Sequence, residues 1–234
     1  MIRHLFLISV FFSITGIMIA NQRVSYTGQN EWFEDPSTER YFITQTGRNI
    51  KQGSGYYQNV LVLFNSAHYG LTDWFSVGLG FEAISTFSGN PIIMLMPKFG
   101  FEITENISIG AGVHYINASA LASEARGGIA YGAVTRDFGR SNVSFGVGWA
   151  FLQDEFSSQP VFNLSGMTRL TRRIGLITEN WLFLSDENSY AIFSYGVRFL
   201  GESTSFDLGL VNSKDIARTF PIGFPAMASF CYYF

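Results

Sequence analysis

Two histidines beyond residue 20, His68 and His114, are the side chains best suited to catalysis or metal binding. A hydrolase needs a serine and an acid beside its histidine, and a metal site needs several ligands. Ser108 shares the face of His114, but their separation along an extended strand is ~20 Å. The sequence also contains no G-x-S-x-G nucleophile motif. We therefore expect no catalytic residue, no metal site and no cofactor.

Three glycine pairs recur at similar distances after expected turns: Gly78-x-Gly80, Gly110-x-Gly112 and Gly146-x-Gly148. A dinucleotide-binding loop needs a further glycine and a following helix, and the sequence predicts neither at these places. Glycines on one face of several strands instead leave space for water, for bulky side chains opposite, or for an inserted segment. The single Cys231 cannot form an internal disulfide. We interpret it as a buried-strand or lipid-facing residue rather than a nucleophile.

The composition narrows the class of protein. Charged residues make up 14% and aromatic residues 17% of the 234 positions, whereas soluble domains average ~25% charged residues. Such an apolar and aromatic chain is not typical of intrinsic disorder. The net charge of −3 provides no basic footprint, so we expect no nucleic-acid partner.

Alternation of apolar and polar residues dominates the chain after residue 40. In residues 75–83 and 143–151, apolar side chains occupy every second position, with small or polar ones between them. A period of two is typical of strands, and no run of ~18 apolar residues predicts a spanning helix here. We predict one all-β domain over 41–234, with about twelve strands (roughly 10 to 14). The expected strands are 41–47, 55–70, 74–85, 91–103, 107–118, 127–138, 143–153, 161–171, 173–184, 190–200, 205–212 and 222–234.

Charged side chains fall in the middle of several expected strands, opposite the aromatic face. They would be costly in the apolar interior of a soluble barrel, but in a wet lumen they can pair with each other or with water. A transmembrane barrel turns its apolar face to lipid and keeps a polar lumen. We therefore expect an inward network of opposite charges. The lumen-lining candidates are Glu82, Lys98, Glu102, His114, Arg136 and Arg198.

Short and long connections alternate between the expected strands, and aromatic residues cluster beside the short ones. Transmembrane barrels have short periplasmic turns, longer outer loops and aromatic girdles at the interfaces. Strands of about 10–13 residues also suit a tilted crossing of the bilayer. The pattern favours an antiparallel up-and-down transmembrane β-barrel. An even strand count places both termini on the periplasmic side.

The N-terminus has the layout of a targeting segment. Residues 1–20 combine a short polar start with an apolar run and end in Ala20, as a secretory signal peptide does. An N-terminal membrane anchor is the alternative, although the run is shorter than the ~20 residues of a spanning helix. We interpret residues 21–40 as a flexible periplasmic lead-in. A plug that folds into the lumen is the second interpretation of this segment.

The last strand carries a resemblance. Ala226, Ala228, Phe230, Tyr232 and Phe234 place apolar or aromatic groups at every second position up to the carboxy terminus. This pattern resembles the terminal strand of Gram-negative outer-membrane proteins, and residues 69–81 resemble hairpins of poorly characterised barrels of that class. The resemblance implies a cell outer-membrane location in contact with outer-membrane lipid. It also implies that Phe230, Tyr232 and Phe234 form an assembly signal for the barrel assembly machinery, but it identifies no site residues.

These observations predict a narrow passive channel for small solutes, or a structural or anchoring barrel, without catalysis. A lipid-modifying outer-membrane enzyme is the first alternative, and a soluble secreted β-barrel that binds an apolar ligand is the second. Barrels of about 8 strands are filled by side chains, whereas those of 16–18 strands leave an aqueous channel. About twelve strands lie between these limits, so the strand number leaves the state of the lumen open.

Overall fold

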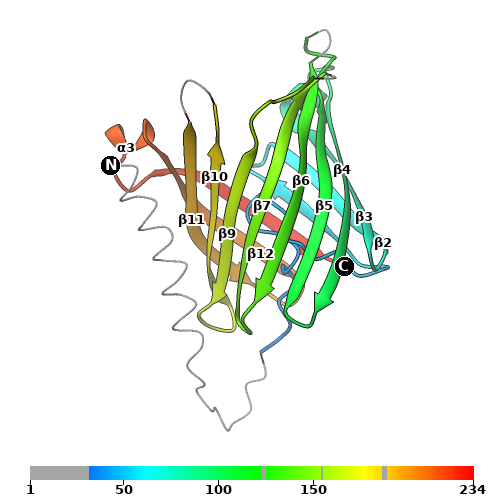
Figure 1. The fold of residues 1–234 in the computed structure, drawn as a ribbon, viewed down its shortest axis with the longest axis vertical. Coiled ribbons are helices and arrows are strands. Elements are labelled where there is room, and N and C mark those ends of the chain that lie inside the picture. The colour runs from blue at the N-terminus through cyan, green and yellow to red at the C-terminus, as the bar shows by residue number, and fades with distance from the viewer. Residues whose placement is uncertain (1–31, 123–124, 154, 186–188) are drawn as a thin grey trace.

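A closed barrel of antiparallel strands makes up most of the chain in the computed structural model (Figure 1). The structure describes residues 32–234 apart from 123–124, 154 and 186–188. The expected signal peptide at 1–20 lies outside these residues, and so does the first part of the expected lead-in.

Neighbouring strands in the barrel are also neighbours in sequence, and β1 pairs with β13 to close the sheet. Within the described residues twelve strands form the wall, which confirms the expected up-and-down barrel. The two-residue β8 (Glu155–Phe156) only extends the edge of β7. The wall consists of β1 (Gly55–Val60), β2 (Phe64–Thr72), β3 (Phe75–Glu82), β4 (Ile92–Thr104), β5 (Ile107–Asn117), β6 (Arg126–Asp137), β7 (Ser141–Leu152), β9 (Val161–Arg169), β10 (Ile174–Phe183), β11 (Tyr190–Leu200), β12 (Thr204–Ser213) and β13 (Phe224–Tyr233).

Two of the expected strand assignments were wrong. One expected strand is absent and another is in fact two strands, so the total of twelve wall strands is still correct. Residues 41–47 are not a wall strand, and the expected strand 55–70 is the hairpin of β1 and β2. Leu61 and Val62 turn this hairpin with φ values of 54° and 66°. Turns with positive φ usually contain glycine or asparagine. This turn consists of apolar residues alone, so the sequence does not predict a turn at this position.

The connections divide the barrel into two ends. Five turns of two to four residues lie at one end, here named the short-turn end, together with the C-terminus (Figure 1). The other end, the long-loop end, carries the helix α2 (Ala83–Phe87) and the helix α3 (Ile216–Thr219). The β1–β2 turn is the only short connection among the described residues at that end. No helix in the described part of the chain is long and apolar enough to span a membrane.

Alternation along each strand separates the two faces of the wall. On β3, Leu79 is 59% exposed, while Ser76 is buried; on β7, Phe145 is 51% exposed, while Ser144 is buried. The outer surface is therefore a band of apolar side chains, and most polar side chains point inward. Such an arrangement suits a barrel that is surrounded by lipid, and it identifies this chain as a transmembrane barrel.

Val113, on the outward face of β5, tests this assignment of the faces. We expect Val113→Arg to lower the free energy of unfolding in lipid by roughly 2–4 kcal/mol, because a charge near the bilayer centre loses its hydration. Ile222 lies exposed in the loop before β13, so Ile222→Arg is the matched control and should have little effect. Equal effects of both substitutions on urea unfolding in vesicles would contradict the assignment.

Candidate functional site

Four of the six lumen candidates lie on the inner face and are shielded from solvent to different degrees. Lys98 and Arg198 are fully buried, Glu82 is buried, and His114 is partly buried. Glu102 is in phase with the inner face, since it pairs with the buried Ser108, but it lies exposed close to the short-turn end.

Arg136 lies on the outer face instead, and its expected place in the lumen is corrected. It pairs with Ile107 on the outward phase of β5, next to the inward Thr135. The Arg136 guanidinium lies 5.1 Å from the Phe138 ring centroid. Small residues occupy both faces of β6, so alternation alone did not reveal the phase of this strand.

The expected charge network does not form among the candidates either. Glu82 caps α2, because its carboxylate accepts hydrogen bonds from the backbone N–H groups of Ile84 (2.9 Å) and Ser85 (2.7 Å). Lys98 donates to the backbone carbonyl of Arg48. Arg198 pairs with Asp207, which was not among the candidates.

The inner face of the barrel contacts a segment of the same chain that precedes β1. Residues 32–54, here named the plug, enter the lumen at the short-turn end, turn at residues 41–45 and return to the same end (Figure 1). A single bridge between Arg40 and Gln45 holds the two limbs together. The plug thus corresponds to the second interpretation of the N-terminal segment, extended through the residues expected to form a first strand.

A buried ionic cluster holds the first limb. Arg198 and Asp207 lie directly opposite each other on β11 and β12 and are joined by two hydrogen bonds of 2.6 and 2.8 Å. Arg40 of the plug reaches the same carboxylate at 3.1 Å and the Ser205 hydroxyl at 2.8 Å. Arg198 in turn donates to the backbone carbonyl of Tyr41 at 2.8 Å. The wall and the plug therefore share one carboxylate, and all three charged side chains are excluded from solvent.

The tip of the plug is held by side chains of β10 and β7, on the same side of the barrel as the ionic cluster. Glu179 on β10 accepts hydrogen bonds from the backbone N–H groups of Ile43 (2.9 Å) and Thr44 (3.1 Å). Tyr41 donates to Asn142 at 2.7 Å. Tyr41 and Phe42 also form an apolar cluster inside the barrel with Met167, Ile177 and Leu200. Polar and apolar contacts thus fix the tip together.

Glycines let the returning limb lie against the wall. Gly47 donates to the Thr135 hydroxyl at 2.7 Å. A Cβ on Gly110 would lie 2.9 Å from the Gly47 carbonyl oxygen, and one on Gly100 would lie 2.8 Å from the Asn49 nitrogen. Gly100 and Gly110 face each other in the β4–β5 register. Gly110, a member of one of the three glycine pairs noted in the sequence, and its cross-strand partner Gly100 therefore make room for an inserted segment, one of the three explanations that those pairs allowed.

Desolvation inside the lumen also affects the plug itself. Burial raises the pKa of the Glu39 carboxyl above its ordinary value, although hydrogen bonds from its own backbone N–H and from the Thr38 hydroxyl lower it. Arg48 on the returning limb forms an ion pair with Asp137 of β6. The charged groups between the plug and the wall are thus partly shielded from water.

Aromatic residues of the plug contact cations of the short turns. The Arg140 guanidinium lies 4.1 Å from the Trp32 ring centroid, and that of Arg169 lies 4.8 Å from the Phe33 ring centroid. Arg169 also donates to the Phe33 carbonyl at 2.8 Å. Contacts of this kind contribute ~0.5–1 kcal/mol at exposed sites and more when desolvated, so they help to keep the plug at the mouth of the barrel.

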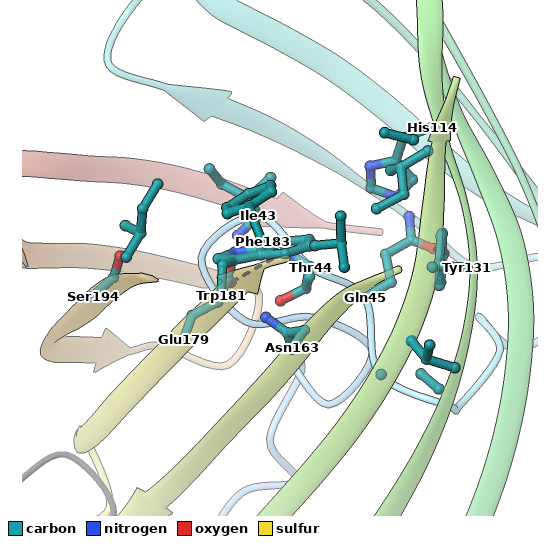
Figure 2. Close-up of a pocket in the computed structure, with 18 of the residues that line it drawn as sticks. Ile43, Thr44, Gln45, His114, Tyr131, Asn163, Glu179, Trp181, Phe183 and Ser194 are labelled. Atoms are coloured by element: carbon teal, nitrogen blue, oxygen red, sulfur yellow. Dashed lines mark hydrogen bonds between the residues drawn. The ribbon is translucent and has the colours of Figure 1, made fainter. Parts of the chain in front are cut away.

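Beyond the tip the lumen contains a cavity of about 460 Å³ (Figure 2). Ile43, Thr44 and Gln45 of the plug line it on one side, and strands from β5 to β13 supply the rest of its lining. Figure 2 shows Glu179, Trp181 and Phe183, which occupy alternate positions of β10, beside the plug residues. The plug and this cavity together make up the candidate functional site.

His68 Nε2 lies 3.1 Å from the Ser66 hydroxyl, but among the described residues neither histidine is paired with both a serine and an acid, as a hydrolase would need. The His68 ring stacks on Tyr56 at 4.5 Å and lies 3.3 Å from the Gln45 amide nitrogen. The His114 ring meets Tyr131 edge-on at 5.2 Å. Among the described residues no group of three or more His, Cys, Asp and Glu side chains could hold a metal ion. Cys231 is fully buried and packs with Ile50 of the plug.

Comparisons with known proteins identify the fold. No known family profile matches the sequence, and no curated protein matches it. Among solved structures, the KdgM porin has 6% identity and a TM-score of 0.53, over 77% of this chain and 96% of that chain. A KdgM porin in complex with disordered oligogalacturonate has 7% identity and a TM-score of 0.54 over the same shares. The NanC porin has 8% identity and a TM-score of 0.46, over 77% of this chain and 97% of that chain. This chain therefore has the β-barrel fold of outer-membrane porins.

Proposed function

We propose that the protein is a passive channel of the outer membrane, closed at its periplasmic end by its own plug. The observation that carries the proposal is the path of residues 32–54, which enter and leave the lumen at the same end. A hairpin inserted in this way can withdraw without breaking any strand pairing of the wall. Solutes would then cross passively, with no catalytic step.

The cavity favours a channel over a purely structural barrel. Side chains could fill the whole lumen of an anchoring barrel, as they do in barrels of about 8 strands. Here about 460 Å³ remains empty beyond the plug. Space on one side of a removable segment is what a closed channel requires.

The orientation forms part of the proposal. Short turns face the periplasm in barrels of this kind, so we place the short-turn end there. Phe234 at the C-terminus and Trp32 at the start of the plug lie at this end. Both ends of the described chain would then be periplasmic.

The solute of the similar porin does not transfer readily to this chain. Oligogalacturonate is an acidic sugar, and a site for it would need cations or many hydrogen-bond donors. The described residues that line the cavity include no lysine or arginine, and Glu179 is their only carboxylate. The lining therefore does not favour an anionic sugar.

Removing the plug tests the proposed function. A chain without residues 32–50 should give steady open conductance in planar bilayers, whereas the intact chain should open rarely. Lys51→Ala is the control within the plug, since the Lys51 side chain is exposed and pairs with the exposed Glu34 at 3.3 Å, and it should conduct like the intact chain. Heat-modifiable gel migration would establish that each barrel is folded. A folded plug-free barrel that conducts no better than the intact chain would favour the structural barrel.

The aromatic end of β13 supports a second element of the proposal, the assembly signal. Phe230, Tyr232 and Phe234 are exposed on the outer face, and Gly55 donates to the Phe234 carbonyl at 2.7 Å where the barrel closes. We expect Phe234→Ala to reduce the amount of barrel in the outer membrane without reducing export across the inner membrane, because export depends on the signal peptide. Fractionation with immunoblotting measures both steps. An unchanged outer-membrane yield, equal to that of the loop control Ile222→Ala, would remove this element.

A further inference from the structure

The wall of the cavity is mostly apolar, although it lies inside the lumen. Inward positions elsewhere in the barrel carry serine, threonine or charged residues, as Ser76, Thr135 and Asp207 do. Around the cavity most inward side chains are apolar instead. Its apolar lining includes Ile116, Ile129, Ala150, Trp181, Phe183 and Ile192.

Most polar side chains around the cavity already have partners, and one exception is His114, whose buried Nε2 has none among the described residues. Glu179 accepts from the Trp181 indole at 2.9 Å with one oxygen and from the plug backbone with the other. Tyr131 donates to the Gln45 side chain at 3.1 Å. Asn163 donates to the Asn180 carbonyl at 3.1 Å and accepts from Ser165 at 2.7 Å. A solute would therefore find few free polar atoms besides the His114 Nε2, enough for one hydrogen bond at the edge of an otherwise apolar contact.

Ile43 gives the plug an apolar tip on this side. It is 48% exposed, although the preceding Tyr41 and Phe42 are buried in the lumen. Covering the exposed apolar surface of such a side chain with another apolar molecule is favourable in free energy, because that surface is removed from water. Water would be bound only weakly there, because an ordered water molecule in a cavity needs two to four hydrogen-bond partners.

We propose that the cavity binds one small, uncharged and largely apolar molecule, such as an aromatic hydrocarbon, against Ile43 of the plug. The inference rests on the proposed channel function and names the class of solute for the same site. The volume of about 460 Å³ falls within the range of small-molecule pockets. Shape and apolar contact would determine the affinity, rather than charge or hydrogen bonding.

Trp181 provides a probe inside the cavity, and Trp149 provides a matched probe outside it. Trp149 lies on the outward phase of β7 and is exposed, so it reports on any compound that merely dissolves in the lipid. The full chain, labelled with 5-fluorotryptophan in lipid nanodiscs, would be titrated with naphthalene and followed by fluorine NMR. Trp181→Phe assigns the resonance. We expect a saturable shift at Trp181 and no saturable shift at Trp149. Glucuronate should shift neither resonance.

Two glycines on adjacent strands supply matched variants. Gly146 lines the cavity, and a Cβ there would only make ordinary contacts, the nearest at 3.5 Å to the Gly132 carbonyl. Gly132 on β6 takes the outward phase, and a Cβ there would meet nothing closer than 3.8 Å. Gly146→Phe should fill the cavity and abolish the saturable shift, while Gly132→Phe should retain it. Heat-modifiable migration checks folding.

Several outcomes would overturn this inference. They are an unmoved Trp181 resonance, an undiminished shift in folded Gly146→Phe, or a saturable shift with glucuronate. Failure of the proposed function would look different, because it concerns the conductance of the plug-free chain. A plug-free barrel that conducts, combined with a Trp181 resonance that naphthalene does not move, would retain the channel and reject only the apolar solute.

Discussion

Replacing Asp207 with asparagine is expected to lower the free energy of unfolding by about 3–5 kcal/mol, because removing one partner of a buried ion cluster leaves uncompensated charge. Both Arg40 and Arg198 direct guanidinium groups at this carboxylate, and all three side chains have relative exposures of 1% or less. The Ser229 hydroxyl also donates to it at 2.8 Å. Asparagine keeps the shape but loses the charge that two cations share. Urea unfolding in vesicles, followed by tryptophan fluorescence, measures the loss.

The exposed pair of Asp215 and Arg218 supplies the control for this prediction. Their charged atoms lie 3.3 Å apart, but both side chains are about two-thirds exposed (65% and 67%). Asp215→Asn should cost less than about 1 kcal/mol, as exposed ion pairs do. Similar losses for Asp207→Asn and Asp215→Asn would mean that water reaches the cluster and that the plug does not seal it.

Arg40→Met is expected to release the plug while sparing the wall. The substitution removes the bonds from the plug to Asp207, Ser205 and Tyr233 but leaves the Arg198–Asp207 pair intact and electrically balanced. Hydrogen bonds to charged groups contribute about 1.5–3 kcal/mol each. Losing the net contribution of one such bond would raise the open population about ten- to a hundredfold.

Single-channel open probability and trypsin cleavage after Arg48 measure this release. Arg48 lies in the returning limb of the plug with a side chain that is only 24% exposed, so its cleavage reports the exposure of that limb. Lys51→Ala is again the control for conductance, since it removes a charge of the same sign at an exposed position. An Arg40→Met barrel with unchanged opening and unchanged trypsin resistance would show that the cluster does not hold the plug.

The barrel was predictable from sequence because lipid imposes the same alternation on most strands. An outward residue such as Phe145 must be apolar, and its neighbour Ser144 must fit a shielded lumen, so the alternation is visible along β7. Where both faces accept small residues the rule weakens, and Arg136 on β6 was therefore placed on the wrong side.

The plug was the part that the sequence concealed. Tyr41, Phe42 and Ile43 have the aromatic and β-branched character of a strand, so local composition predicted a wall strand at 41–47. The burial of Tyr41 and Phe42 depends on contacts with residues more than a hundred positions away, such as Asn142 and Met167. One clue was present nonetheless. Asp207 lies between Phe206 and Leu208 as Arg198 lies between Val197 and Phe199, and the same argument would have placed it in the lumen.

The central claim is that the plug closes the pore, and a reversible crosslink tests it most directly. The hydroxyl oxygens of Thr44 at the tip and Ser165 on β9 lie 3.5 Å apart, so cysteines in their place are close enough to form a disulfide. The pair Thr44→Cys and Ser165→Cys would be introduced into a chain that carries Arg40→Met and Cys231→Ser, with Thr44→Cys alone as the control. Single-channel recording should show no openings after oxidation and frequent openings after reduction, whereas the control should open in both states. Equal conductance of the oxidised, crosslinked chain and the reduced chain would contradict the account.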